Sequence, residues 1–178
     1  MKFTFLCEDQ AKISTYIIGE SSLSILIEVD NKKFLFDTGG HTIEHNAELL
    51  GINLKDIDGI IISHSHWDHS NGLLQLEKYL PKTTPVYLHP DCFKKTYVAY
   101  EKYPEVIANQ KERLCVLAVE GQEKPAKYIG MPYTLEEMKE KYSIKLCEAS
   151  TKISNSVIFL GAIPRLTSFE AKSNLSWQ

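Results

Sequence analysis

Four side chains that could bind a metal ion fall within six consecutive residues of this sequence. They are His64, His66, Asp68 and His69. Imidazole nitrogens combined with a carboxylate oxygen form the ligand set expected for zinc or a similar divalent ion. A solvated histidine, or a helix-capping role for Asp68 or Ser70, would explain one of these residues but not the whole cluster. The cluster therefore predicts a metal site.

The segments on either side of the cluster predict how it is positioned. The three isoleucines at 60–62 indicate a strand that is buried on both faces, and we expect this central strand over residues 57–63. Leucines at 73, 76 and 80 then recur at helical spacing until Pro81 ends the helix. The four polar side chains are thus expected on a strand-to-helix loop, where they can converge on one point.

Residues 64–69, His-Ser-His-Trp-Asp-His, match the His-x-His-x-Asp-His signature of the metallo-β-lactamase fold superfamily position by position. The chain resembles this superfamily over roughly residues 20–170. Residues 35–39, Leu-Phe-Asp-Thr-Gly, are similar to its strand-ending Asp-Thr-Gly, and residues 85–90 resemble its next strand. Residues 161–165, with Phe169 and Glu170, are similar to a stretch of the metal-dependent branch of 7,8-dihydropterin-6-methyl-4-(β-ribofuranosyl)aminobenzene-5'-phosphate synthases.

The resemblance implies an α/β fold, an αββα sandwich, in a single domain over residues 1–178. His64 and His66 would bind a first metal, and Asp68 and His69 a second. The metal is expected to be zinc, although iron and manganese accept the same ligands. Metal-activated water would attack an ester or phosphoester bond of a small, in this branch phosphorylated, substrate, with Asp68 in a catalytic role that orients the water or moves its proton. Asp37 would steady the metal ligands through hydrogen bonds, unless it only ends its strand in an Asx turn.

The resemblance is incomplete in the second half of the chain. Members of the superfamily use a third histidine, a bridging aspartate and a last histidine further along, but this chain has no histidine after His89 and no aspartate after Asp91. We therefore expect an incomplete metal site in an N-terminal portion of a longer enzyme, and it stays open whether this chain is an enzyme by itself. A sheet that lacks its cover would seek a companion chain or self-associate. A non-catalytic remnant that binds metal weakly is the alternative.

Composition excludes several other classes of protein. With 178 residues, 43% hydrophobic and 24% charged, the chain is typical of a soluble globular domain. A net charge of −3 without a basic block argues against nucleic-acid binding, and no apolar run is long enough to span a membrane. The N-terminus does not resemble a signal peptide, and the four cysteines form no C-x-x-C pair. Both features indicate reduced thiols in a cytoplasmic protein rather than a thiol redox enzyme.

The remaining pattern predicts the following elements: strands over 3–6, 23–29, 33–36, 86–88, 114–119, 144–146 and 157–160, helices over 43–50, after Asp91 and from Thr134, a further helix after Pro104, and a loop over 121–130. The helix after Asp91 rests on an aromatic stripe of Phe93, Tyr97 and Tyr100. The helix from Thr134 rests on a capping box.

Three further histidines and one arginine have weaker claims to a function. His41 and His45 are expected on a solvated rim, and a chelating role for their i,i+4 spacing is the less favoured alternative. His89 is expected to form hydrogen bonds at the edge of the site. Arg165 is either a surface residue or a contact for an anionic group.

Overall fold

The computed structural model describes residues 1–11, 15–99, 114–119, 122–164 and 166. The chain divides into two compact units, each described by itself. The first contains Met1–Phe93 and Met131–Ile163, and the second contains Lys94–Gly130 and Pro164–Gln178. Three of the predicted features fall outside the described residues. They are the helix after Pro104, the end of the aromatic stripe at Tyr100, and Arg165.

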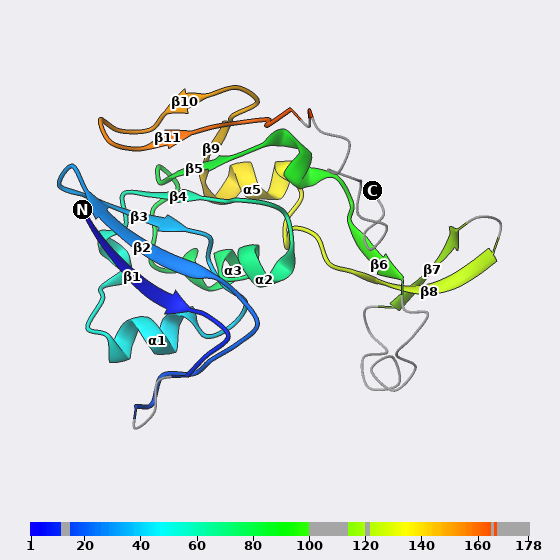
Figure 1. Cartoon of the computed structure of the whole chain (residues 1–178), viewed down its shortest axis with the longest axis horizontal. Helices are drawn as coiled ribbons and strands as arrows, with labels where there is room; N and C mark the ends of the chain where they lie inside the picture. Colours follow the sequence, from blue (N-terminus) through cyan, green and yellow to red (C-terminus); the bar gives the residue numbers. More distant parts are fainter. Residues whose placement is uncertain (12–14, 100–113, 120–121, 165, 167–178) are drawn as a thin grey trace. The chain divides into compact units, whose positions relative to one another are not determined.

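The first unit is built on a six-stranded sheet (Figure 1). Its strands are β1 (Lys2–Cys7), β2 (Ser24–Val29), β3 (Lys32–Phe36), β4 (Gly59–Ile61), β5 (Pro85–Leu88) and β9 (Ser143–Leu146), in the order β1-β2-β3-β4-β5-β9. The first three strands are antiparallel, and β3, β4, β5 and β9 run parallel. The strands predicted over 23–29 and 33–36 form a hairpin, in which Asp30 and Asn31 both have positive φ (53° and 55°), as a tight turn between β2 and β3 requires.

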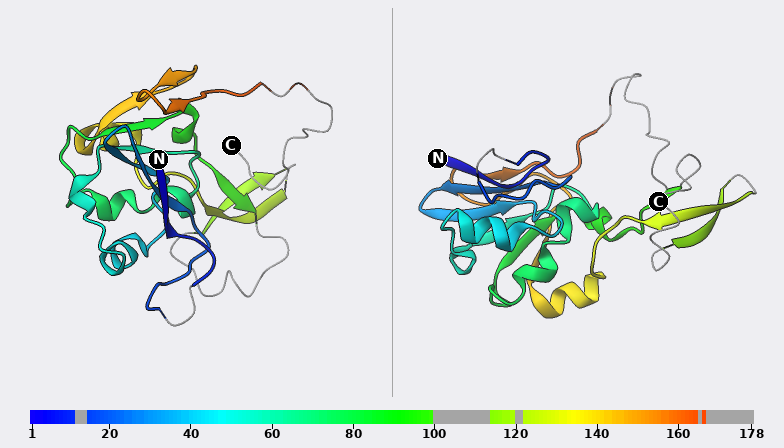
Figure 2. Two further views of the ribbon diagram at one scale, coloured as in Figure 1. Left: turned by 60° about the vertical axis from the view of Figure 1, so that its left-hand side comes forward. Right: turned by 90° about the horizontal axis from the view of Figure 1, so that it is seen from below.

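Helices cover one side of this sheet (Figure 2, right). They are α1 (Ile43–Leu49), α2 (Trp67–Ser70), α3 (Leu73–Leu76) and α5 (Leu135–Lys141), with the short 3-10 turns η1 (Leu54–Asp56) and η2 (Pro90–Phe93) between them. The capping box of α5 is confirmed, since Thr134 and Glu137 exchange both hydrogen bonds. The helix expected over residues 73–80 is shorter than predicted: α3 begins at Leu73 but ends at Leu76, and Asn71 and Gly72 separate it from α2.

The core lies between the sheet and these helices. The strand register aligns Leu26, Leu35, Ile60 and Val86 as neighbours in a row across four strands, and each is at most 2% exposed. Leu73 and Leu76 of α3 and Met138 of α5 belong to the same buried cluster. The parallel part of the sheet is therefore held by apolar burial on the helical side, at about 25 cal/mol per Å² of apolar surface.

The other face of the sheet is also apolar, but it is less covered at its β1 edge. Register places Phe5 beside Ile25, Ile25 beside Phe36, and Phe3 beside Ile27. Phe3 and Phe5 remain 53% and 54% exposed. A short hairpin of β10 (Thr151–Lys152) and β11 (Ile158–Phe159) is tied to the β2–β3 turn, where Ser154 and Ser156 donate hydrogen bonds to the Asp30 carboxylate.

The second unit contains a three-stranded antiparallel sheet that corrects two predictions. Its strands are β6 (Tyr97–Ala99), β8 (Gln122–Tyr128) and β7 (Leu114–Val119), with β8 in the middle. The aromatic stripe does not form a helix, because Tyr97 pairs with Tyr128 across two strands and their rings meet edge to face at 5.4 Å. The predicted loop over 121–130 is mostly β8, while the strand over 114–119 is confirmed.

No helix in the described ranges is at once long enough and apolar enough to cross a bilayer.

Candidate metal centre

The site is assembled where two parallel strands end side by side. Phe36 of β3 pairs with Ile61 of β4, so the residues that follow both strands emerge at the same edge of the sheet. Asp37 comes directly after β3, and Ser63 precedes the histidine cluster after β4. The cluster is not wholly on a loop as predicted, because His66 is the N-cap of α2 and Asp68 and His69 lie inside that helical turn.

The structure brings the four predicted ligands together. The ring of His64 lies 4.6 Å from the ring of His66 and 4.1 Å from the ring of His69, measured between centroids. His69 Nε2 lies 3.5 Å from an Asp68 carboxylate oxygen. Within the part of the chain that the structure describes, no group of three or more His, Cys, Asp or Glu side chains is already arranged around one point. The four side chains are therefore neighbours, without a preformed cage of three ligands among the described residues.

Asp37 is the most heavily bonded side chain of the site. It is fully buried, and its backbone has a left-handed φ of 56°. Its Oδ1 accepts the Ser63 backbone N–H at 2.7 Å, and its Oδ2 accepts the Ser63 hydroxyl at 2.6 Å and contacts His69 Nδ1 at 2.8 Å. The carboxylate thus touches a predicted metal ligand directly.

The ring nitrogens that remain point to Nε2 as the available donor. His69 uses Nδ1 on Asp37, and His64 uses Nδ1 on the Ser63 hydroxyl at 2.9 Å. Metal-ligating histidines commonly engage the other ring nitrogen in this way. The donor types therefore fit a divalent cation. In both imidazoles the Nδ1 atom is engaged and Nε2 is left to bind the cation, and the Asp68 carboxylate lies next to His69.

The protonation of these histidines is set by burial and charge. Burial lowers the pKa of His64, and the neighbouring His69 and His66 lower it further. Burial also lowers the pKa of His66. For His69 burial acts in the same direction, but the hydrogen bond and charge of Asp37, together with Asp68, outweigh it and raise its pKa. His64 and His66 are consequently neutral near pH 7, as metal binding requires.

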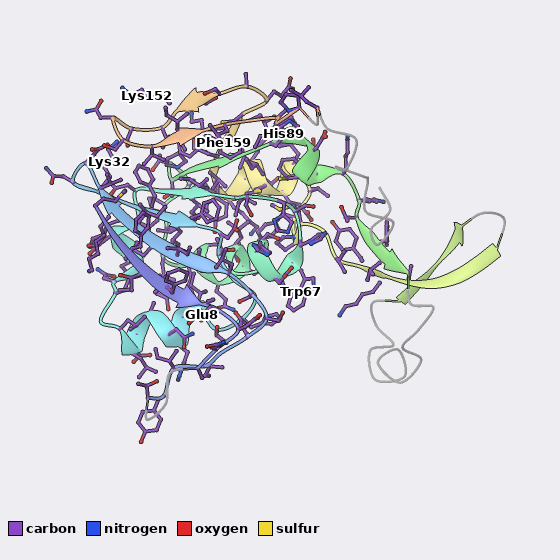
Figure 3. All side chains as sticks on the ribbon, viewed as in Figure 1. Glu8, Lys32, Trp67, His89, Lys152 and Phe159 are labelled. Carbon is purple, nitrogen blue, oxygen red and sulfur yellow. The ribbon has the colours of Figure 1, made fainter. Side chains whose placement is uncertain are left out.

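The other histidines lie apart from this cluster. His41 precedes α1 rather than sharing its face with His45, and its ring lies 5.9 Å from the ring of Trp67. His45 Nε2 contacts the Tyr16 carbonyl at 2.8 Å. His89, which follows β5 (Figure 3), accepts the backbone N–H of Asp91 within its own turn, and its predicted place at the edge of the site stays a prediction.

A cleft of about 440 Å³ opens beside the cluster. Asp68 and His69 form part of its wall, and the remaining lining residues are Glu8, Asp9, Gln10, Ser21, Ser22 and Leu23. Its size is within the range of small-molecule sites. Apart from Leu23, the described lining residues are polar or charged, and none of them is a lysine or arginine.

Sequence reasoning missed two residues that support the site. Ser63 was counted only as the end of a strand, although its hydroxyl bridges Asp37 and His64. Glu20 accepts hydrogen bonds from the backbone of Gly40, His41 and Thr42, which holds the loop after Asp37. A hydroxyl next to His64 was a visible signal, whereas nothing in the sequence marks Glu20.

Comparison with known proteins agrees with this architecture. The family model for the metallo-beta-lactamase superfamily matches residues 17–132, more than half of the chain. The chain is 38% identical over 109 residues to the 7,8-dihydropterin-6-methyl-4-(beta-D-ribofuranosyl)-aminobenzene-5'-phosphate synthase of Methanocaldococcus jannaschii, in an alignment that covers 58% of this chain and 37% of that protein. It is 27% identical over 154 residues to an uncharacterized protein of the same organism, covering 85% of this chain and 50% of that protein.

Among solved structures, the crystal structure of Tm1679, a metal-dependent hydrolase of the β-lactamase superfamily, superposes with a TM-score of 0.59. The identity is 23%, and the match covers 89% of this chain and 47% of that chain. This likeness concerns the fold alone. The chain spans half or less of the length of these relatives. On the match of its family model and on its fold, the chain belongs to the metallo-β-lactamase superfamily.

Proposed function

We propose that this chain carries the first half of the active site of a metal-dependent hydrolase. The observation that supports this function most directly is the arrangement of His64 and His69, whose Nδ1 atoms are both engaged at the same edge of the sheet. Their Nε2 atoms are then the ones left to bind a cation, with His66 and Asp68 next to them. A divalent cation held there would polarise an ester or phosphoester bond and make water acidic enough to supply hydroxide at neutral pH.

Each side chain has a distinct task in this proposal. His64 and His66 would hold one cation, and His69 and Asp68 a second. Catalytic zinc usually has three protein ligands, so two for each cation make a weak site. Asp68 would also orient water or accept its proton, since this residue lines the cleft. Zinc is the cation to test first, and iron and manganese are the alternatives.

The cleft restricts how a substrate would lie. Glu8 and Asp9 bring negative charge to its wall, and none of its described lining residues is a lysine or arginine. A phosphoryl group would therefore face the histidine cluster and its cation, while hydroxyl or amine groups of the substrate face the two carboxylates. Because a relative is a synthase of a phosphorylated pterin compound, small phosphorylated substrates of that kind are the first to assay.

The test compares zinc binding and hydrolysis in the purified chain and two histidine variants. His66→Ala removes a proposed ligand, whereas His45→Ala removes an exposed histidine that contacts only a carbonyl in the described structure. We expect zinc affinity to fall at least about tenfold in His66→Ala and to stay unchanged in His45→Ala. Equal zinc content in both variants would remove the ligand assignment. Generic phosphodiester and ester substrates then report whether the zinc-loaded chain hydrolyses either bond.

A second candidate is a chain that binds metal weakly and needs a companion chain for activity. Two exposed phenylalanines, Phe3 and Phe5, favour it, because they stand beside apolar neighbours on the sheet face away from the helices. A companion chain that supplies a second sheet and the missing ligands would cover this face. Co-expression with a fragment of a relative that extends beyond the match should then yield a complex with higher zinc affinity. A monomer by light scattering that binds zinc and hydrolyses esters alone would contradict this candidate.

We propose the cytoplasm as the location of the chain. Cys7, Cys92 and Cys147 are buried and free, which is typical of a reducing compartment. The side chain of Cys115 lies outside the described residues.

A further inference from the structure

One carboxylate is connected to two of the three clustered histidines. Asp37 Oδ2 contacts His69 Nδ1 directly at 2.8 Å, and it reaches His64 Nδ1 through the Ser63 hydroxyl, at 2.6 Å and then 2.9 Å. We propose that Asp37 fixes the tautomer of both rings, of His69 by direct contact and of His64 through Ser63. Ser63 is in this view a positioning residue, which acts on His64 rather than on a substrate.

The hydrogen atoms available to these groups determine both tautomers. A carboxylate can only accept, so the single hydroxyl hydrogen of Ser63 is donated to Asp37 Oδ2. The Ser63 oxygen can then only accept from His64, and His64 must carry its hydrogen on Nδ1. The same carboxylate oxygen accepts from Nδ1 of His69. Both neutral rings therefore hold Nδ1–H and leave a lone pair on Nε2.

The geometry also keeps the carboxylate from rotating. Oδ1 accepts the backbone N–H of Ser63 at 2.7 Å, while Oδ2 faces the hydroxyl and His69. Asp37 is fully buried, so water does not compete for these bonds. The tautomers are consequently set by the folded protein before any cation is present. His66 takes no part in these bonds and serves as an internal reference.

The substitution Asp37→Asn should reverse the direction of every hydrogen in this chain of bonds. An asparagine can keep its carbonyl oxygen toward the Ser63 N–H and direct its NH₂ group toward the hydroxyl and His69. Ser63 then accepts from the amide and donates to His64 Nδ1, and both rings must move their hydrogen to Nε2. The substitution thus preserves the contacts but removes both Nε2 lone pairs.

The test is long-range ¹H–¹⁵N spectroscopy of the imidazoles in the metal-free protein, in mildly alkaline buffer where the rings are neutral. Single His→Gln variants assign the signals. We expect Nδ1–H rings for His64 and His69 in the wild type. Ser63→Ala should release His64 into a mixture of tautomers and leave His69 unchanged, Ser63→Thr should restore His64, and Asp37→Asn should convert both rings to Nε2–H.

Three results would overturn the proposal. They are an Nε2–H ring at His64 in the wild type, an unchanged His64 in Ser63→Ala, and an Asp37→Asn protein in which only His69 switches. The wild-type spectrum needs no variant, so the proposal stays testable even if Ser63→Ala does not fold. Circular dichroism checks the fold of each variant.

Zinc titration with a chromophoric competitor adds a second measurement, which rests on the proposed function. Ser63→Ala should weaken zinc binding about 10- to 100-fold, and Ser63→Thr should restore it. If the tautomers follow the expected pattern but the wild type binds no zinc, the metal-dependent function fails while the role of Ser63 stands. If zinc binds and the tautomers do not follow, the reverse holds.

Discussion

Gly72 is the position where a single added methyl group should disturb the site most. A Cβ there would lie 2.0 Å from the carbonyl oxygen of Thr38, which is far inside van der Waals contact. Three hydrogen bonds join the same segments: Thr38 N–H and Thr38 Oγ1 to the His69 carbonyl, at 2.8 and 3.1 Å, and Gly72 N–H to the Gly39 carbonyl at 3.0 Å. Gly72→Ala must therefore push the loop after Asp37 away from α2.

The size of the effect follows from these contacts. Three hydrogen bonds at about 0.5–1.5 kcal/mol each amount to about 1.5–4.5 kcal/mol. Alanine offsets up to about 1 kcal/mol of this through its higher helix propensity, since Gly72 already has helical backbone angles. We expect the free energy of unfolding to fall by about 0.5–3.5 kcal/mol, measured by urea denaturation followed by circular dichroism. The displacement should also weaken the Asp37–His69 bond, which the imidazole spectrum of His69 reports.

Gly51→Ala is the matched control. Gly51 has a φ of +68° with nothing within 4 Å of its Cβ position, so alanine there is strained by its backbone alone, at about 1–2 kcal/mol. This variant should be destabilised without any change in the His69 spectrum or in zinc affinity. A Gly72→Ala protein as stable as the wild type, with an unchanged His69, would refute the reasoning about close packing.

Three further predictions concern charge and hydrogen bonds. The pKa of His69 is raised in the folded protein, so its ion pair with Asp37 contributes stability that is complete below the unfolded pKa of about 6.5 and is lost as the pH rises through the folded pKa. Asp37→Asn should therefore cost more stability at about pH 6 than at mildly alkaline pH. An equal cost in urea titrations at the two pH values would mean that the pair is not charged. Thr134→Ala removes the α5 capping box and should cost about 0.5–2 kcal/mol in thermal or urea unfolding, with zinc affinity as the unaffected control. Tyr142→Phe removes the buried hydroxyl that donates to the Leu73 carbonyl at 2.8 Å and should cost about 1 kcal/mol; no loss in a urea titration would mean that water replaces this bond.

Local signals in the sequence were sufficient for the elements that depend on neighbouring residues. Asp30-Asn31 adopts the left-handed angles that its hairpin needs, and Thr134 with Glu137 forms the capping box. The apolar run at 60–62 predicted a central buried strand, and β4 is fully buried between two parallel neighbours. These interactions act over a few residues, so a pattern can predict them.

The elements that were wrong depend on distant partners. Tyr97 and its neighbours fit helical spacing, but they pair with residues 126–128 of β8. Charged residues, Pro125 and two glycines made residues 121–130 resemble a loop. The pairing of β8 with β6 ends at Ala126, so Pro125 is paired only with Val116 of β7. At that position β8 is an edge strand, where a proline is tolerated. Neither pairing leaves a periodic signal in one sequence.

In the site, too, local patterns could be predicted and contacts between distant residues could not. The signature predicted which four side chains would gather, and the resemblance predicted that Asp37 would approach them. The bond between Asp37 and His69 agrees with that geometry, while metal binding by the four residues stays a prediction. The bridging place of Ser63 could not be predicted, because it depends on Asp37 arriving from 26 residues away.

The left-handed backbone of Asp37 has a consequence for engineering this chain. Glycine adopts a φ of 56° without the steric cost that a side chain bears there. Asp37→Gly would relieve this backbone cost, but it would also remove the buried carboxylate that accepts hydrogen bonds from Ser63 and His69. Libraries at position 37 would therefore set backbone strain against the groups that arrange the histidine protons. Screening such libraries for zinc retention as well as heat resistance would keep the two properties together.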